Sequence, residues 1–533
     1  MEGRDMKRLS ILATLGLAVL VLPSPAARAD SDDKGSLSAS FETNTTYYFN
    51  DEGTGATAPD GRFGSNNYLK LDYAKGGFTA GVQLEGYLPA VSGYFSGTLA
   101  AENFLSYDIY AGFAANGWDI RVGSLYEQFG SGLLFRTYED RELGINNALQ
   151  GVRVAYTFGD YLSVRGLYGR VRNVREYSDA MVSGADLSFS LSRLLDMEKF
   201  DIVLEGSVID KYEAQPSNAD ASWSSHSPGY SGRLLLGYEG FQLKGEYMDR
   251  RSDPAFYNSL NNGRSKAIQV DLSYTGNGFG GLVTFRKLDN PFFQGIRSES
   301  GMYTYINYVP ALTQQHTYML ATLNPYSAQS DEIGGQADLY YNFRRGTALG
   351  GKKGMKIHAN FSNYFNSGYK ADNLIDKLLF RDLTIDIERW FGSDFKLILL
   401  YSWQTYNELT QMNGTDILTS HALVADMTYK INRKNSVRLE LQHLFGSPED
   451  HGNWAAALLE YNFAPRWSFA VQDMWNYGDT GLHYPSGSIS YSYGKVRCAI
   501  NAGRFKEGYL CSGGVCRMTP AYTGINLSLI ATL

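Results

Sequence analysis

The stretch Val437-Arg438-Leu439-Glu440-Leu441-Gln442 alternates apolar and polar side chains, and Phe395-Lys396-Leu397-Ile398-Leu399-Leu400-Tyr401-Ser402-Trp403 likewise carries one apolar face. A period of two is the pattern of a β-strand that is apolar on one side. In a soluble protein a second layer covers such a face, but no helical periodicity separates these stretches to supply one. Lipid covers the apolar faces when strands close into a barrel, because closure satisfies every backbone hydrogen bond. The pattern therefore predicts an all-β, transmembrane antiparallel β-barrel.

Similar stretches recur as far as the C-terminus. They begin near residues 36, 67, 78, 104, 118, 152, 161, 185, 200, 232, 241, 267, 279, 335, 355, 380, 395, 422, 436, 454, 467, 487, 496 and 522. We therefore expect about 24 strands, with about 22 to 26 as the range if a hairpin is miscounted.

The N-terminus has the layout of a secretory signal peptide. Arg4, Lys7 and Arg8 precede an apolar run from Ile11 to Leu22, and the small-residue site Ala27-Arg28-Ala29 follows it. We expect residues 1–29 to be removed and residues 30–533 to form a single barrel domain. A membrane helix is the alternative for the apolar run, which is short for a span.

The composition agrees with an outer-membrane barrel. The chain holds 39 Tyr, 28 Phe and 7 Trp, 57 Gly and only 14 Pro, as expected where lipid-facing and interior-facing residues alternate. The net charge is −7 and both signs are interspersed, so the basic face that nucleic-acid binding requires is missing.

The connections alternate between short and long, which orients the barrel. Short turns such as Lys75-Gly76-Gly77, Asn116-Gly117 and Glu239-Gly240 are flanked by aromatic residues, as in an interfacial aromatic belt. Bacterial outer-membrane barrels have short periplasmic turns and longer extracellular loops. An even strand count then places both termini in the periplasm. The expected extracellular connections are residues 51–63, 89–102, 127–150, 172–181, 210–230, 249–264, 289–333, 365–378, 406–419, 446–453, 478–485 and 505–521.

Alternation also assigns charged residues to the interior. They include Glu85, Asp108, Arg121, Arg153, Arg165, Asp386, Glu388, Arg438 and Glu440. These charges either tune the selectivity of a hydrated passage or brace the wall as cross-strand ion pairs, and we favour bracing for most of them.

A barrel of this size is too wide for wall side chains to fill, and two long connections are candidates to narrow it. Residues 124–150 contain glycines and alternating charges, and would form a constriction loop or a solvated surface loop. The charged residues of that loop are Glu127, Arg136, Glu139, Asp140, Arg141 and Glu142. Residues 289–333 carry Phe292, Phe293, Tyr303, Tyr305, Tyr308, His316 and Tyr318, which would pack as a cap or bind a glycan or partner.

Three cysteines are present. Cys511 and Cys516 flank a Gly-rich loop suited to a disulfide in an oxidising compartment; reduced thiols or a metal site are the alternatives, although two thiols without His or carboxylate partners make a poor zinc site. Cys498 alternates with Val496 and Ile500, which suits a small apolar residue on the lipid face.

Catalytic chemistry has no support in the sequence. The seven His residues are scattered, and no signature joins them to a nucleophile and an acid. No phosphate-binding glycine loop or paired metal-ligand spacing is present. We expect no enzymatic activity, no catalytic residues, no metal and no cofactor.

Two stretches resemble a family of uncharacterised outer-membrane proteins from the Bacteroidota. They are Arg121-Val122-Gly123-Ser124-Leu125-Tyr126-Glu127-Gln128-Phe129-Gly130-Ser131-Gly132 and Cys511-Ser512-Gly513-Gly514-Val515-Cys516-Arg517. The resemblance implies a barrel in a Gram-negative outer membrane and supports the paired cysteines, but it implies no activity. Too few residues precede the first strand for the plug domain of a TonB-dependent receptor.

Two functions fit these features. The first is a passive channel or transporter for small solutes, indicated by the charged interior. The alternative is a non-conducting scaffold of a secretion, barrel-assembly or surface-lipoprotein complex, indicated by the many outer loops. The partners are outer-membrane lipid in both cases, and other outer-membrane proteins or surface lipoproteins in the second.

Overall fold

The computed structural model describes most of the chain after the N-terminal segment. The described residues are 35–95, 97–215, 224–251, 253, 264–297, 305–314, 317–321, 323–368, 377–407, 417–447 and 452–533. The predicted signal peptide at residues 1–29, Tyr303 and His316 lie outside them. Among the described residues, no helix is long and apolar enough to cross a membrane.

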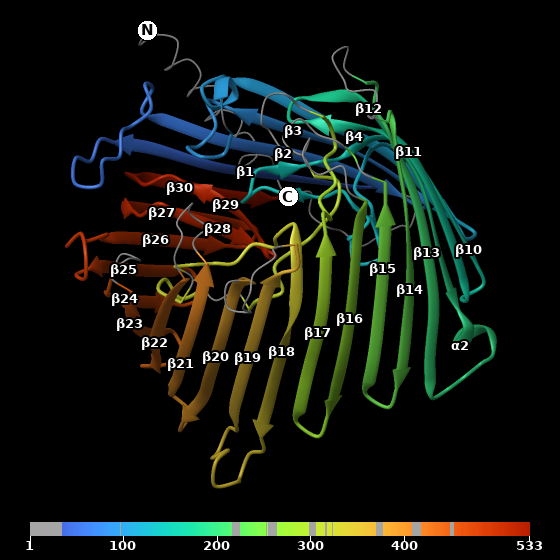
Figure 1. Cartoon of the computed structure of the whole chain (residues 1–533). Helices are drawn as coiled ribbons and strands as arrows, with labels where there is room; N and C mark the ends of the chain where they lie inside the picture. Colours follow the sequence, from blue (N-terminus) through green and yellow to red (C-terminus); the bar gives the residue numbers. More distant parts are fainter. Residues whose placement is uncertain are drawn as a thin grey trace.

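Twenty-four strands form one closed antiparallel barrel, as predicted (Figure 1). In order around the wall they are β1 (Ser36–Phe49), β2 (Phe63–Lys75), β3 (Phe78–Tyr87), β4 (Phe104–Ala115), β5 (Trp118–Leu125), β10 (Leu149–Phe158), β11 (Leu162–Asn173), β12 (Glu176–Ser190), β13 (Phe200–Tyr212), β14 (His226–Tyr238), β15 (Phe241–Arg250), β16 (Ser265–Gly276), β17 (Phe279–Asp289), β18 (Asp331–Phe343), β19 (Met355–Asn366), β20 (Leu378–Phe391), β21 (Phe395–Asn407), β22 (Ile417–Lys430), β23 (Asn435–Gly446), β24 (Trp454–Phe463), β25 (Trp467–Asn476), β26 (Ser486–Tyr493), β27 (Val496–Phe505) and β30 (Tyr522–Thr532). Each strand pairs with the next in this order, and β30 pairs with β1 to close the ring.

Successive side chains in the wall point to opposite faces, as the period of two requires. On β4, Leu105 is 65% exposed and Ile109 is 55% exposed, whereas Asp108, which points to the opposite face of the strand, is 6% exposed. The apolar residues thus lie on the outside of the barrel. Rings beside the short turns, such as Trp118 and Phe241, are also exposed.

Twelve of the connections between wall strands lie at the end of the barrel opposite Ser36, where β1 begins, and Thr532, where β30 ends. We call this the loop end; the other end is the turn end. One predicted loop is wrong. Residues 172–181 belong to β11 and β12, which are joined by a turn at Val174 and Arg175 instead of a long loop. Val174 adopts a positive φ of 54°, a conformation that turns normally assign to Gly or Asn, so residue type did not predict this turn. The turn end also holds two longer connections that were not predicted, residues 191–199 with the short helix α2 (Leu191–Leu194) and residues 344–354.

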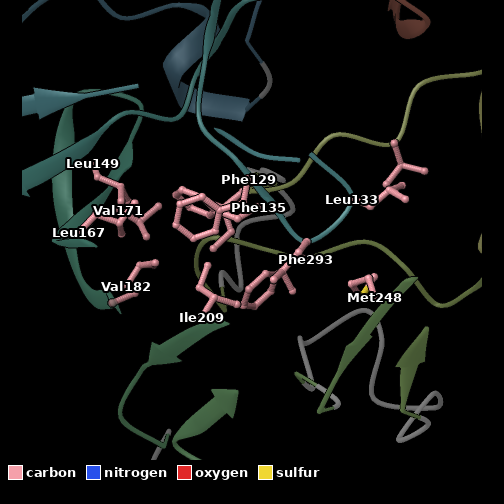
Figure 2. Close-up of a cluster of buried hydrophobic side chains, with 14 of the residues drawn as sticks. Phe129, Leu133, Phe135, Leu149, Leu167, Val171, Val182, Ile209, Met248 and Phe293 are labelled. Atoms are coloured by element: carbon pink, nitrogen blue, oxygen red, sulfur yellow. The ribbon is translucent and has the colours of Figure 1, made fainter. Parts of the chain in front are cut away.

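Apolar packing inside the barrel is concentrated at the loop end. Figure 2 shows Phe129, Phe135 and Phe293, which belong to connections, packed on inward-facing wall residues such as Val171 and Ile209. Two further clusters join Leu320 and Tyr326 to the wall in the same way. Connecting segments therefore enter the barrel and fill part of the interior that the side chains of the wall alone would leave empty.

Candidate functional site: a constriction built from three in-folded segments

Three connections form the candidate site, which we call the constriction. The first, residues 126–148, contains the two-residue strands β6 (Gln128–Phe129), β7 (Phe135–Arg136), β8 (Glu139–Asp140) and β9 (Ile145–Asn146). The second comprises the described part of residues 290–330. The third is the hairpin of β28 (Gly508–Ser512) and β29 (Val515–Thr519).

The turns of the first segment follow from its sequence. Gly130 and Gly132 have φ values of 57° and 93°, which Gly adopts without the steric penalty that other residues meet. Between β8 and β9, the Asp140 carboxylate accepts hydrogen bonds from the backbone N–H groups of Glu142 (3.0 Å) and Leu143 (2.9 Å). Such Asx contacts are typical of tight turns.

Backbone hydrogen bonds join the three segments into one unit. The Arg136 N–H donates to the Ile306 carbonyl (2.9 Å), and the Tyr308 N–H donates to the Gly132 carbonyl (2.9 Å). The Ala311 N–H donates to the Gly514 carbonyl at the hairpin tip (2.8 Å). Because these donors and acceptors are satisfied by one another, each segment depends on its neighbours for its position.

The first segment reaches across the interior from one side of the wall to another. Ser131 Oγ donates to the carboxylate of Glu246 on β15 at 2.6 Å. Arg141 lies 2.7 Å from the carboxylate of Glu42 on β1 and 2.9 Å from that of Glu139. A loop that contacts both β1 and β15 lies inside the ring and narrows it.

Predicted site residues from the loop and the wall meet in one cluster. The Glu127 carboxylate lies 3.0 Å from Arg153 on β10 and 3.0 Å from Arg165 on β11. Arg165 also forms an ion pair with Asp186 on β12, at 2.7 Å. These charges tie the constriction to the wall. Among the remaining loop residues, Arg136 stacks on the Tyr308 ring with its Cζ 3.9 Å from the centroid.

The other predicted interior charges have wall partners. Arg121 lies over the Tyr110 ring at 3.8 Å. Asp386 accepts a hydrogen bond from Nδ1 of His358 at 2.6 Å, and Nε2 of the same ring lies 2.9 Å from Asp338. Glu388 is opposite Lys356 in the β19–β20 register, and Arg438 pairs with Asp426 and Glu440. The contacts of Asp386 with His358 and of Arg438 with Asp426 join neighbouring strands and can brace the wall.

Two buried ion pairs beside the constriction were not predicted from the sequence. Arg172 on β11 forms ion pairs with Glu85 on β3 and Asp108 on β4, and it is 2% exposed. The carboxylates were predicted to face inward, but Arg172 was assigned to an outer loop. A bulge between Arg170 and Arg172 interrupts the alternation there, so the pattern could not place the guanidinium.

Two cavities that are lined by described residues lie beside the hairpin. The larger, cavity 1, has a volume of about 670 Å³ and touches Gly514 to Arg517. Its lining includes Glu85, Arg172, Tyr94, Tyr138, Tyr308 and Arg517. The smaller, cavity 2, has a volume of about 430 Å³ and touches Tyr509 to Cys511.

Burial controls the ionisation of the groups around cavity 1. Burial raises the pKa of Tyr94 and of Tyr138 well above the ordinary value, so both hydroxyls stay neutral hydrogen-bonding groups. Burial lowers the pKa of Arg517, whose guanidinium donates to the carbonyl oxygens of Gly93 and Glu142. Cavity 1 is therefore lined by neutral phenols together with charges of both signs.

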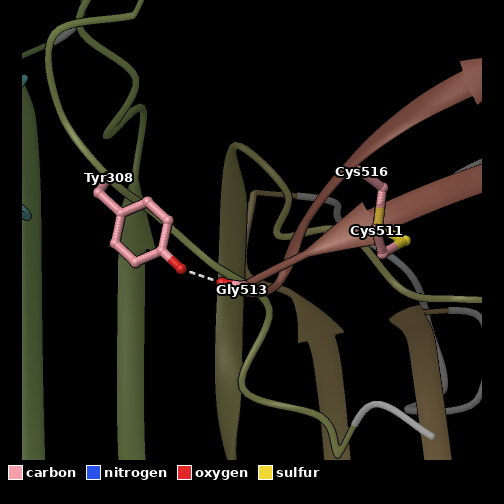
Figure 3. Close-up of a disulfide and its surroundings, with 4 residues drawn as sticks. All are labelled: Tyr308, Cys511, Gly513 and Cys516. Atoms are coloured by element: carbon pink, nitrogen blue, oxygen red, sulfur yellow. Dashed lines mark hydrogen bonds between the residues drawn. A yellow bond between two sulfur atoms is a disulfide. The ribbon is translucent and has the colours of Figure 1, made fainter. Parts of the chain in front are cut away.

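The predicted disulfide is confirmed. Cys511 and Cys516 are bonded and lie opposite each other in the β28–β29 register (Figure 3). Cys498 on β27 is a free, half-buried cysteine. Among the described residues, no group of three or more His, Cys, Asp or Glu is placed to hold a metal ion.

Several solved structures resemble this fold. A chain of the E. coli P pilus tip assembly intermediate PapC-PapD-PapK-PapG has a TM-score of 0.51 at 11% identity, over 95% of this chain and 62% of that one. This chain therefore spans less than two thirds of the length of that pilus-assembly chain. The Pseudomonas aeruginosa outer-membrane protein opdK has a TM-score of 0.38 at 10% identity, over 93% and 98% of the two chains. OccK9 (OpdG) of the same organism has a TM-score of 0.39 at 11% identity, over 94% and 99%.

These identities relate the folds alone. No curated protein sequence matches the chain. Residues 6–533 match the sequence model of a family of unknown function, DUF6029. The uncharacterised family anticipated from the sequence is thereby confirmed, whereas an origin in the Bacteroidota stays a prediction. The chain belongs to the family of unknown function DUF6029.

Proposed function

We propose that the protein is a non-enzymatic channel of the Gram-negative outer membrane through which small solutes diffuse passively. The observation that carries the proposal is the division of the wall into an exposed apolar outer face and a charged inner face. Lipid would contact the outer face and water the inner one. Cavity 1, between the three segments of the constriction, provides the route at the narrowest level.

The charged loop residues act as anchors in this proposal. Glu127, Arg141 and Ser131 bind wall residues on β10, β1 and β15. They hold the constriction open at a fixed width, in the way that ion pairs fix geometry more effectively than they add stability. Their removal would change conductance before it unfolded the barrel.

Conductance in planar bilayers tests the channel. The wild-type protein should give discrete current steps. Replacing residues 508–519 by a short Gly-Ser linker removes the hairpin beside both cavities and should enlarge the steps. Removing residues 347–350, from a connection at the turn end, is the matched control and should leave them unchanged. A folded wild-type barrel that carries no current would overturn the proposal.

A non-conducting scaffold is the second candidate, and the packing of the constriction favours it. Phe129, Phe135 and Phe293 are 0% exposed, which is the packing of a folded core. A scaffold should be silent in bilayers and should co-purify with stoichiometric outer-membrane proteins or lipoproteins in mild detergent. A conducting barrel that purifies alone would exclude this function.

The proposal includes export through a signal peptide, as expected for a protein of this compartment. Residues 1–29 would be removed, so N-terminal sequencing of the protein from outer membranes should begin at Asp30. A retained N-terminus would contradict this part of the proposal while leaving the channel itself unaffected.

A further inference from the structure

Cavity 2 contains a buried carboxylate without a cationic partner. Asp382 on β20 lines this cavity and is 2% exposed. Its oxygens accept hydrogen bonds from Gln404 Nε2 (2.9 Å), Thr384 Oγ1 (3.1 Å) and Ser402 Oγ (3.5 Å), all of them neutral donors. No ion pair joins Asp382 to a Lys, Arg or His in the described part of the chain.

This isolation sets Asp382 apart from the other buried acids nearby. Glu332, which is 0% exposed, is paired with Arg286 at 2.7 Å. Asp426 is paired with Arg438 at 3.0 Å. A buried charge that is left without a counter-charge is costly, so the absence of a cation beside Asp382 requires a physical reason.

Two buried oxygen atoms in this region have no hydrogen-bond partner. Ser362 is opposite Asp382 in the β19–β20 register and is 0% exposed, and its Oγ has no hydrogen-bond partner. Gln314, which also lines cavity 2, has an Oε1 atom that is buried and unpaired. Buried polar atoms are normally satisfied. Of these two residues only Gln314 lines cavity 2, and its Oε1 is an acceptor that an N–H donor in the cavity could satisfy.

Aromatic rings also line cavity 2. Tyr326 and Phe380 are stacked with centroids 4.9 Å apart, and Tyr509 of the hairpin also contributes. Ring faces attract cations, most strongly where water is excluded. The volume of about 430 Å³ lies in the range of small-molecule sites, roughly 300–1,000 Å³.

We infer that cavity 2 is a binding site for a small organic cation, with a primary ammonium group at Asp382 and an apolar body against the rings of Tyr326, Phe380 and Tyr509. An ammonium group has three N–H donors, which suits a site composed of the Asp382 carboxylate and the unpaired Gln314 Oε1. Hard metal cations instead need about six or more oxygen ligands, and a single bare ion would leave the rings without a role.

The inference deepens the proposed channel, and it rests on that function only for the passage of the cation. Binding is measured on the purified barrel in detergent without any current, so either proposal can fail alone. A conducting barrel that does not bind the cation would overturn the site only, and a silent barrel that does bind it would overturn the channel only.

Isothermal titration with 2-phenylethylammonium chloride tests the site. The wild-type barrel should bind this amine saturably, and should bind the uncharged 2-phenylethanol and the anionic phenylacetate much more weakly. Asp382→Asn should weaken amine binding about tenfold or more, because a charge-assisted contact is replaced by a neutral one. Equal affinity in Asp382→Asn, or tighter binding of phenylacetate, would overturn the inference.

Asp271→Asn is the matched control. Asp271 on β16 also faces the interior and accepts from a Gln and a Thr, Gln269 and Thr284, but it does not line cavity 2. This variant should bind the amine as the wild type does. If both variants weaken binding equally, the effect is a general one of wall charge and the site is overturned.

Two further arms complete the experiment. Tyr509→Ala removes a ring from the hairpin, which is not part of the barrel wall, so this variant tests the site even if Asp382→Asn does not fold. Its amine binding should weaken about threefold or more. Titration with calcium chloride and with sodium chloride tests the metal alternative. Stoichiometric metal binding that Asp382→Asn abolishes, without amine binding to the wild type, would assign the cavity to a metal ion and overturn the inference.

Discussion

Tyr308, in the connection between β17 and β18, donates its hydroxyl hydrogen to the carbonyl oxygen of Gly513, 205 residues further along the chain (Figure 3). The contact joins the tip of the disulfide-bonded hairpin to a segment that also binds the first in-folded segment through Arg136 and Ile306. The width of the constriction therefore depends on three distant parts of the chain held against one another.

Gly514 should be the residue on which hairpin docking depends most. A Cβ there would lie 2.7 Å from Pro310 Cβ and 2.8 Å from the Ala311 oxygen, and the φ of Gly514 is +83°. Gly514→Val should displace the hairpin and increase both the conductance of single channels and their current noise. The control is Gly481→Val, where φ is +69° but nothing lies within 4 Å, so backbone strain is retained without the clash. Equal currents in both variants would mean that this contact does not hold the hairpin.

Arg172 should contribute strongly to barrel stability. Arg172→Met leaves Glu85 and Asp108, both nearly inaccessible to solvent, without their counter-charge, and removal of one partner from a buried pair costs about 3–5 kcal/mol. The free energy of unfolding by urea, measured in lipid vesicles, should fall accordingly. Arg175→Met breaks only exposed pairs, those with Glu102 and Glu176, and should cost less than about 1 kcal/mol. Similar losses in the two variants would show that burial of the pair is unimportant.

The contact between Asp51 and Arg504 should depend on pH. Hydrogen bonds from Arg504 at 2.6 and 2.8 Å, outweighing burial, hold the pKa of Asp51 below its ordinary value. Because the pKa of Asp51 is lower in the folded state, the stabilisation that this contact provides is complete above the unfolded pKa of about 3.9. It is lost as the pH falls through the folded pKa.

Hydrogen exchange of residues 50–62, corrected for the intrinsic rate, should therefore accelerate as the pH falls below about 4. Asp51→Asn should remove this acceleration and exchange quickly at every pH. Asp60→Asn changes an exposed carboxylate in the same connection and should behave as the wild type does. Acceleration that persists in Asp51→Asn would assign the pH dependence to another group.

How far the sequence predicts this molecule is clear from Asp108 and Arg172. Asp108 could be placed in the interior because strict alternation along β4 fixes its face. Arg172 could not, because a bulge and a turn with Val174 at positive φ leave no signal in residue type. Local glycines and charges made residues 124–150, with Glu127 and Arg141, a candidate in-folding loop, but they left a solvated surface loop equally open. Their partners, and the docking of Tyr308 on Gly513, join segments far apart in sequence, and no local pattern encodes such contacts.

The orientation of the barrel gives the last prediction. The connection at residues 477–485 lies at the loop end and the connection at residues 344–354 at the turn end, and short turns of outer-membrane barrels face the periplasm. A short epitope inserted after Gly481 should bind antibody on intact cells, whereas one inserted after Gly346 should require permeabilised cells. Nothing lies within 4 Å of a Cβ at either glycine, so both insertions should be tolerated. Equal detection in detergent extracts controls for expression. Surface detection at Gly346 but not at Gly481 would mean that the barrel has the opposite orientation, with the constriction on the periplasmic side. Solutes would then meet the charged half of the interior before the constriction.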